Sequence, residues 1–173
     1  MRRILGWSGV SAVAALVLLA AVARAEDKKP EKIAPDKFPK AVMDAIKGRF
    51  PKAEITSAEK ETEDGKVVYD IELKSEGRKY EMDIQEDGTI DEIEKAIAVK
   101  DLPVAVTRAL EARYPRATLK EAMEVYDVVG KDETLSEYAV SLETAGKKDV
   151  DVRVSLDGKT IKEEEDDTEA GSG

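Results

Sequence analysis

The sequence has no cysteine and no histidine among its 173 residues. Without cysteine the chain can form no disulfide, offer no thiol nucleophile and carry no lipid anchor on a cysteine. Without histidine it has no imidazole base, no Ser-His arrangement and no histidine metal ligand. Zinc sites of the usual types are excluded for the same reasons. The stability of the fold must therefore come from packing.

Aromatic residues and glycine-rich motifs are also scarce. Phe, Trp and Tyr make up 5% of the chain, and no stretch matches a P-loop or a dinucleotide-binding glycine fingerprint. Carboxylate pairs such as Asp83 with Asp87, or Asp149 with Asp151, could in principle act as the acids of a glycosidase do. However, a chain with 38 acids contains many such pairs by chance. We therefore predict that the protein is not an enzyme and has no cofactor.

A long apolar run occurs once, at the N-terminus. Arg2 and Arg3 precede apolar residues 4–22, and Ala23-Arg24-Ala25 supplies the small residues that a signal peptidase reads. We predict a cleaved signal peptide at residues 1–25 and a periplasmic or secreted protein that has no membrane contact after cleavage. About 20 apolar residues can also span a bilayer, so a retained anchor is the alternative.

The remaining chain is strongly acidic. Residues 1–25 hold three arginines and no acid, so their removal leaves 25 bases against 38 acids and a formal charge of −13. Nucleic acids and anionic membrane surfaces attract clusters of Lys and Arg. We therefore predict a protein as the partner, rather than a nucleic acid.

The middle of the chain contains an internal sequence repeat, with its two copies sixty-four positions apart. Each copy opens on an apolar-Pro pair, Phe38-Pro39 or Leu102-Pro103, and later reaches an aromatic-Pro pair. Twelve aligned positions between 38/102 and 58/122 are identical or exchange one apolar residue for another. A repeat of this length indicates one structural unit present twice.

Each copy begins as a helix and continues as strands. Val42, Ile46 and Phe50 recur at four-residue steps, which predicts an amphipathic helix between the two prolines. The apolar period then changes to two, and acid-Gly turns recur about every dozen residues. In the first copy we expect strands at about 53–61, 66–74, 78–85 and 89–95. The predicted fold class is α+β, with two tandem repeats of one helix packed on a four-stranded antiparallel sheet. The repeats either share one continuous sheet or form two.

These patterns divide the chain into six segments. They are a signal peptide (1–25), a flexible leader (26–37), a first repeat (38–95), a linker (96–101), a second repeat (102–162) and a disordered acidic tail (163–173).

The ordered set of motifs resembles the PepSY-like domains of exported bacterial proteins, which are grouped with the beta-lactamase-inhibitor-protein-like fold. The resemblance rests on the Leu/Phe-Pro start, the Phe/Tyr-Pro-x-Ala helix exit and strands that carry Asp64-Gly65-Lys66 and Val68-Tyr69-x-Ile71-x-Leu73. It implies a helix on one face of a four-stranded antiparallel sheet, repeated in tandem. It also implies a non-enzymatic role outside the cytoplasm, such as binding or restraining another protein, for example a peptidase. No binding residue carries over position by position.

Two features are candidate partner surfaces. The first is a hairpin at 125–136, which a five-residue insertion in the second copy lengthens. It is unusually apolar for a loop because of Val125, Tyr126, Val128, Val129 and Leu135. Exposed apolar residues on a projecting hairpin would indicate a contact site, whereas a hairpin that folds back on its sheet would not.

The second candidate is the sheet face that points away from the helices, for which the alternative is an ordinary solvated surface. In the first copy this face carries Val68, Asp70, Glu72, Lys79, Glu81 and Asp83, and in the second Ala139, Ser141, Glu143, Asp151 and Arg153.

Calcium binding is the alternative function. Asp83-x-x-x-Asp87-Gly88 and Asp149-x-Asp151 are fragments of the acid spacing that calcium loops use, and neither completes it. The acidic tail at 163–169 could gather divalent cations weakly. A calcium-responsive or ion-sequestering protein is therefore the second hypothesis.

Overall fold

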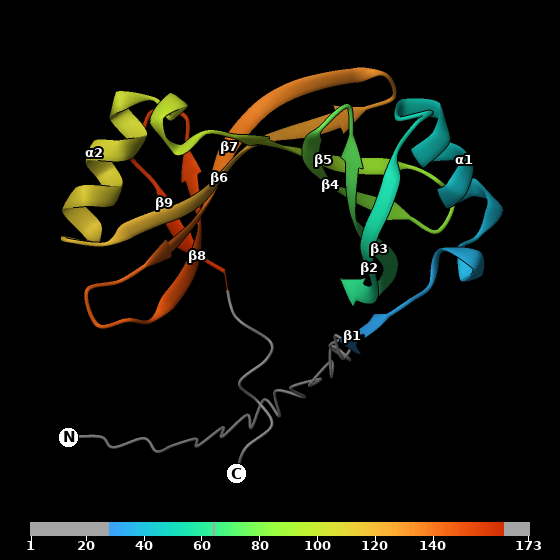
Figure 1. Cartoon of the computed structure of the whole chain (residues 1–173). Coiled ribbons are helices and arrows are strands. Elements are labelled where there is room, and N and C mark those ends of the chain that lie inside the picture. Colours follow the sequence, from blue (N-terminus) through green and yellow to red (C-terminus); the bar gives the residue numbers. More distant parts are fainter. Residues whose placement is uncertain (1–27, 64, 165–173) are drawn as a thin grey trace, which may run out of the picture.

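The computed structural model describes residues 28–63 and 65–164 (Figure 1). The predicted signal peptide at 1–25 lies outside the described residues, as do positions 165–173 of the predicted disordered tail. The first two residues of that tail are ordered instead, because Glu163 ends a strand and Glu164 pairs with Arg153.

Two helices and nine strands make up the described chain. Their order is β1 (Lys28–Lys32), α1 (Lys40–Arg49), β2 (Glu54–Glu63), β3 (Lys66–Ser75), β4 (Arg78–Gln85), β5 (Ile90–Ile97), α2 (Val104–Arg113), β6 (Thr118–Val129), β7 (Asp132–Glu143), β8 (Asp149–Ser155) and β9 (Ile161–Glu163). Short 3-10 turns, η1 (Pro35–Lys37) and η2 (Val99–Asp101), precede the two helices.

All nine strands form one antiparallel sheet whose spatial order follows the chain. The first half (α1 with β2–β5) joins the second (α2 with β6–β9) through pairing of β5 with β6, from Glu92 opposite Asp127 to Ile97 opposite Ala122. The predicted α+β class is confirmed. The strands expected in the first copy end within two residues of the observed ones. The question left open by the sequence is also answered, because the sheet is continuous.

The ninth strand, β1, departs from the sequence prediction. The sequence indicates a flexible leader at 26–37, but Lys28–Lys32 pairs with β2 as an edge strand. Glu31 lies opposite Lys60 and Lys32 opposite Glu59, and the Ile33 N–H donates to the Ala58 carbonyl at 3.0 Å. Pro30 is compatible with this place because an edge strand has one side on which no N–H is needed. The segment lacks an apolar alternation, so its sequence did not predict the strand.

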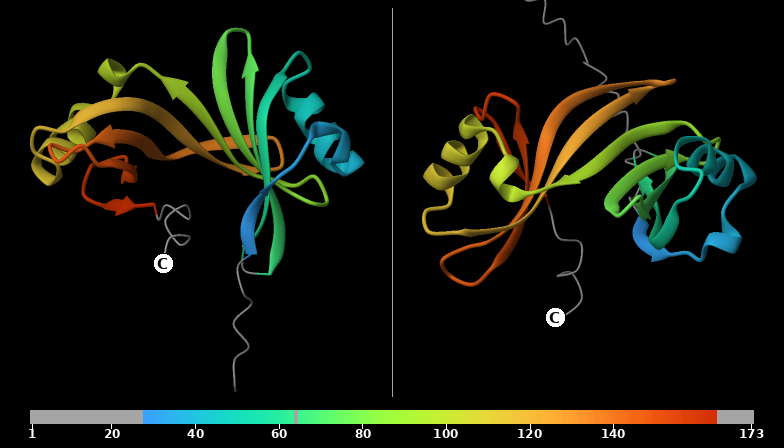
Figure 2. Two further views of the ribbon diagram at one scale, coloured as in Figure 1. Left: turned by 60° about the horizontal axis from the view of Figure 1, so that its bottom comes forward. Right: turned by 45° about the horizontal axis from the view of Figure 1, so that its top comes forward.

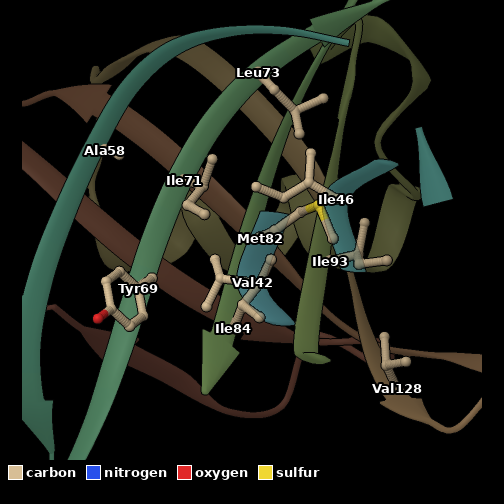
Figure 3. Packing of buried hydrophobic residues seen from close by; sticks show 10 residues of the cluster. All are labelled: Val42, Ile46, Ala58, Tyr69, Ile71, Leu73, Met82, Ile84, Ile93 and Val128. Carbon is tan, nitrogen blue, oxygen red and sulfur yellow. The ribbon is translucent and has the colours of Figure 1, made fainter. Parts of the chain in front are cut away.

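Each helix packs on its own half through two fully covered residues. These are Val42 and Ile46 on α1, and Val106 and Leu110 on α2. Both helices end at an aromatic residue just before a proline. The backbone N–H of Phe50 donates to Ile46 at 2.7 Å, and that of Tyr114 donates to Leu110 at 2.8 Å. Figure 3 shows the first core, in which the α1 residues meet side chains of β3, β4 and β5.

Both helices lie on the same face of the sheet, at opposite ends of the molecule (Figures 1 and 2). Ile93 packs in the first core and Ile97 packs against the second. These residues are four apart on one strand, so their side chains point to the same side. We call the opposite side, which carries Glu92 and Glu94, the open face.

A glycine turn supports the first turn of each helix. A Cβ on Gly88, between β4 and β5, would lie 2.8 Å from the Ala41 carbonyl oxygen. A Cβ on Gly158, between β8 and β9, would lie 2.5 Å from the equivalent oxygen of Ala105. Both glycines also have positive φ angles, of 89° and 71°, which other residues rarely adopt. The two halves therefore repeat the contact between turn and helix as well as the helix and the sheet.

Candidate binding site on the open sheet face

A cavity of about 410 Å³ lies on the open face and takes its walls from both halves. The first half contributes Glu61, Asp70, Lys79, Glu81, Met82, Asp83, Glu92 and Glu94. The second half contributes Glu121, Met123, Ala139, Val140, Ser141, Asp151, Arg153 and Glu164. Most of the outer-face residues predicted from the sequence are therefore brought together around one cavity.

Acids stand directly opposite acids on the open face. One row crosses four strands, from Glu59 on β2 to Asp70, Asp83 and Glu92. A second row crosses three strands as Glu72, Glu81 and Glu94. We call these seven residues the acidic ladder. Like charges placed directly across a sheet destabilise it, so the ladder lowers the stability of the fold instead of adding to it.

Asp70 lies in the middle of the ladder. Burial, followed by the charges of Glu81, Glu61, Glu72 and Glu59, raises the pKa of its carboxyl from 3.8 to about 7. No salt bridge to Asp70 occurs in the described part of the chain. The group therefore exchanges its proton near neutral pH.

Glu94 occupies a more enclosed place, with 10% of its side chain exposed. Burial raises the pKa of Glu94 to about 8, the nearby Glu81 and Glu92 act in the same direction, and the guanidinium of Arg153 opposes them. The ladder thus holds two carboxyls whose ionised forms are disfavoured. Perturbed carboxyls of this kind are typical of functional sites.

Arg153, on β8, connects the second half to the ladder. Its Nη1 lies 2.7 Å from Glu92, its Nη2 lies 2.6 Å from Glu94, and its Nε lies 2.6 Å from Glu164. Two strands separate β5 from β8, so a flat sheet would hold them about 14 Å apart. Contacts at hydrogen-bond distance therefore require the sheet to bend around the open face, as Figure 2 shows.

Lys79, on β4, is the other base of the cavity. Its Nζ lies 2.8 Å from Glu81, 3.7 Å from Glu72 and 3.8 Å from Glu121. Nine acids and two bases line the cavity, so its charge is strongly negative. Such an arrangement can attract a cationic group but offers no base-and-nucleophile pair of the usual kinds.

The five apolar residues predicted as a contact site lie in different environments. Val125 is buried on the open face opposite Glu94, and Leu135 packs against the second core. Val128 is buried in the first core, although it belongs to the second half (Figure 3). The Tyr126 ring lies 3.9 Å from the Lys95 ammonium, and its hydroxyl donates to Glu124 at 3.0 Å. Val129, at the hairpin tip, is 79% exposed.

The same hairpin, residues 125–136 (the arm), docks on the first half. Arg49, at the end of α1, donates from Nη1 to the Lys131 carbonyl at 3.3 Å and places Nη2 3.1 Å from Glu133. Lys95 on β5 also forms an ion pair with Glu133. In Figure 1 the arm arches across the molecule toward α1. The insertion that lengthens the arm therefore contributes to the junction between the halves.

The acids that resemble calcium-loop fragments have other partners. Asp87 accepts the Thr89 N–H at 2.9 Å, and this bond lowers the pKa of its carboxyl. Asp149 pairs with Lys120 at 2.6 Å, and Asp151 accepts the Ser141 hydroxyl. Within residues 28–63 and 65–164, no three carboxylates converge as a metal site would require. The described geometry gives the calcium hypothesis no support.

Five acids that line the cavity were not predicted from the sequence: Glu61, Glu92, Glu94, Glu121 and Glu164. The alternation of Glu92 and Glu94 around Ile93 was a usable signal for the open face of β5. The position of Glu164 beside Arg153 depends on the bend of the sheet, and local sequence carries no signal for it.

Neither ten-residue helix of the described chain has the length or apolar content to cross a membrane.

Comparison with known proteins gives one family. A family model described as "Putative beta-lactamase-inhibitor-like, PepSY-like" matches residues 24–92 and 68–162. No curated protein matches the sequence.

Several solved structures share the fold. A BLIP-like protein from Bacteroides fragilis is 23% identical with a TM-score of 0.50, and the match covers 76% of this chain and 91% of that one. A DUF2874 family protein from Bacteroides uniformis is 14% identical with a TM-score of 0.54, covering 72% and 88%. A protein from Bacteroides eggerthii, described among "putative periplasmic proteins", is 12% identical with a TM-score of 0.54, covering 73% and 88%.

Proposed function

The chain belongs to the PepSY-like, beta-lactamase-inhibitor-like family, as its sequence motifs indicated, and we propose that it is an exported, non-enzymatic binding module. The absence of histidine and cysteine from the sequence supports the non-enzymatic part of this proposal. The N-terminal signal-peptide pattern and the periplasmic description of a related fold support export.

The open face is the surface that binds. The observation that carries this proposal is the cavity of about 410 Å³ to which both halves contribute, lined by nine acids and two bases. A shared wall explains why two repeats are joined in one sheet, because neither half encloses the cavity alone. The excess of acids favours a partner that presents a basic segment, since opposite charge attracts the partner and excludes acidic surfaces.

The partner class that we propose is an extracytoplasmic protein such as a peptidase, whose activity the module modulates or inhibits. The inhibitor-like description of the family supports this choice. The bend of the sheet allows the open face to surround a protruding segment of the partner.

The arm is a second, smaller contact in this proposal. Of its five apolar residues Val129 is the most exposed, and it is the one offered to a partner. Val125, Tyr126, Val128 and Leu135 hold the arm in position through the contacts described above.

Affinity capture with charge-reversed variants tests the proposal. The bait is the chain itself, exposed to the extracytoplasmic fraction of its host. Glu121 lines the cavity with 65% of its side chain exposed, so Glu121→Lys should fold normally and lose the captured protein. The matched control is Glu111→Lys, on an exposed position of α2, which should retain it.

Circular dichroism on both variants confirms that each is folded. Equal recovery with wild type and Glu121→Lys would show that the open face is not the binding surface. Recovery of nothing above background with wild type, and again with the arm deleted, would count against a binding role.

A further inference from the structure

Asp70 is surrounded by acids from every strand that packs beside it. The charged groups that face it are Glu59 and Glu61 on β2, Glu72 on β3, and Glu81, Asp83 and Lys79 on β4. Lys32 on β1 lies beyond, opposite Glu59. Two of these acids, Glu59 and Asp83, stand directly across from Asp70 on either side.

The bases near Asp70 are engaged elsewhere or too distant to pair with it, and Arg153 binds Glu92 and Glu94. Lys79 is held by Glu81 at 2.8 Å, and Lys32 lies one strand further away. A carboxylate between two directly opposed carboxylates, on a half-buried sheet face, is costly to ionise. One proton shared by the row relieves the repulsion, as it does for paired acids in other proteins.

We propose that the acidic ladder is a proton-gated site, in which Asp70 carries a proton until the pH rises or a cationic group of the partner takes its place. This regulation rests on the proposed function, since it governs the same open face. In the protonated state the ladder presents one charge fewer and repels itself less. In the ionised state the ladder offers its full charge to a Lys or Arg side chain of the partner.

The linkage between proton release and cation binding determines whether affinity increases or decreases with pH. The pKa of Asp70 is about 7 in the folded chain, so the carboxyl is protonated in mildly acidic solution and ionised in mildly alkaline solution. A cation bound beside Asp70 favours its ionised form and releases the proton. Affinity for a basic segment must therefore increase with pH across neutrality.

Fluorescence anisotropy measures this effect with a hexa-arginine peptide that has blocked termini and a tetramethylrhodamine label, whose charge does not change in this pH range. Arginine keeps its charge throughout, so only the protein titrates. The chain has no histidine, and it must be used without a histidine tag so that no imidazole titrates in the same range. Measurements at low salt between about pH 5.5 and about pH 8.5 bracket the transition at about 7.

Wild type is expected to bind the peptide roughly fivefold more tightly at the upper pH, which corresponds to one added charge near the ligand. In Asp70→Asn the increase should fall to about twofold, because Asp70 no longer titrates while Glu94, whose pKa is raised to about 8, still does. Asp101→Asn removes an exposed acid from η2 and leaves the ladder intact, so it should behave as wild type.

Each result has one meaning. A pH dependence that is equally steep in wild type and Asp70→Asn overturns the gate and leaves the binding role standing. If wild type binds the peptide equally well at every pH, the proton gate is also overturned and the binding role again stands. A failure of wild type to bind the peptide at any pH overturns the proposal that the open face receives a basic segment.

Discussion

The two halves of the protein have the same structure on the face of the sheet that carries the helices, and they differ elsewhere. Each half covers its core with a ten-residue helix that ends before a proline and rests on a glycine turn. The hairpin that follows the helix differs, because β6 and β7 have twelve residues each where β2 and β3 have ten. The longer hairpin places Val128 in the core of the other half. Duplication therefore preserved the packing unit, while a change in length tied the units together.

The open faces of the halves also differ, in a complementary way. The first half contributes the acidic ladder, in which acids oppose acids. The second half contributes Arg153, which reaches Glu92 and Glu94 across two intervening strands. One half thus carries the excess charge and the other carries a base that partly balances it. This asymmetry gives the face a site that a symmetric repeat would not have.

Substitution of the two equivalent turn glycines should have the largest effect on the free energy of unfolding. Gly88→Ala and Gly158→Ala would each press a Cβ against a helix carbonyl oxygen and force a positive φ on alanine. We expect each substitution to lower the free energy of unfolding by about 2–3 kcal/mol, measured by urea denaturation. Gly77→Ala is the control, since its φ is 82° but a Cβ there meets nothing within 4 Å. A loss at Gly77 as large as at Gly88 would show that contact with the helix is unimportant.

The docking of the arm predicts an effect that crosses between the halves. Val128→Ala removes two methyl groups from the first core and should cost about 2 kcal/mol. Amide hydrogen exchange should become faster in α1 and β3, although the substitution lies in β6. If exchange changed only in β6 and β7, the arm would not contribute to the core of the first half.

The ladder predicts an unusual dependence of stability on pH. The pKa of Asp70 is raised from 3.8 to about 7 on folding, so its contribution to stability is complete at acid pH and is lost as the pH rises through 7. Between about pH 5 and about pH 7, wild type should lose up to about 1 kcal/mol per pH unit relative to Asp70→Asn. Parallel curves of unfolding free energy against pH for the two proteins would contradict this.

A substitution at the tip of the arm should have the smallest effect on stability. Val129→Ser should change the free energy of unfolding by less than about 0.5 kcal/mol, because the side chain is 79% exposed. The same substitution should weaken binding of the captured partner, measured by surface plasmon resonance. An unchanged dissociation constant would remove Val129 from the contact surface.

Local patterns in the sequence were sufficient for most of the fold. The prolines at 39, 51, 103 and 115, the acid-Gly turns and the change of apolar period from helix to strand all act within a few residues. They predict the helices, and they place the strands of the first half within two residues of those observed.

Features that depend on distant contacts were not predicted. β1 forms by pairing with the edge of β2, and Lys28–Lys32 has no apolar pattern that would predict a strand. The destination of Val128 depends on where the arm meets the other half. The approach of Arg153 to the ladder depends on the bend of the whole sheet. For the site, the outer-face residues were predictable from alternation, whereas their convergence on one cavity was not.

The two halves form one body with a shared open face, joined where β5 pairs with β6. Native-state hydrogen exchange of the amides in this pairing, around Ile93 and Tyr126, tests this arrangement most directly. If the halves form one body, these amides exchange only on global unfolding, with the same free energy as the amides of Ile71 and Val140 in the two cores. Faster exchange at the junction, with each core still protected, would mean that the halves separate and that the open face is not a single surface.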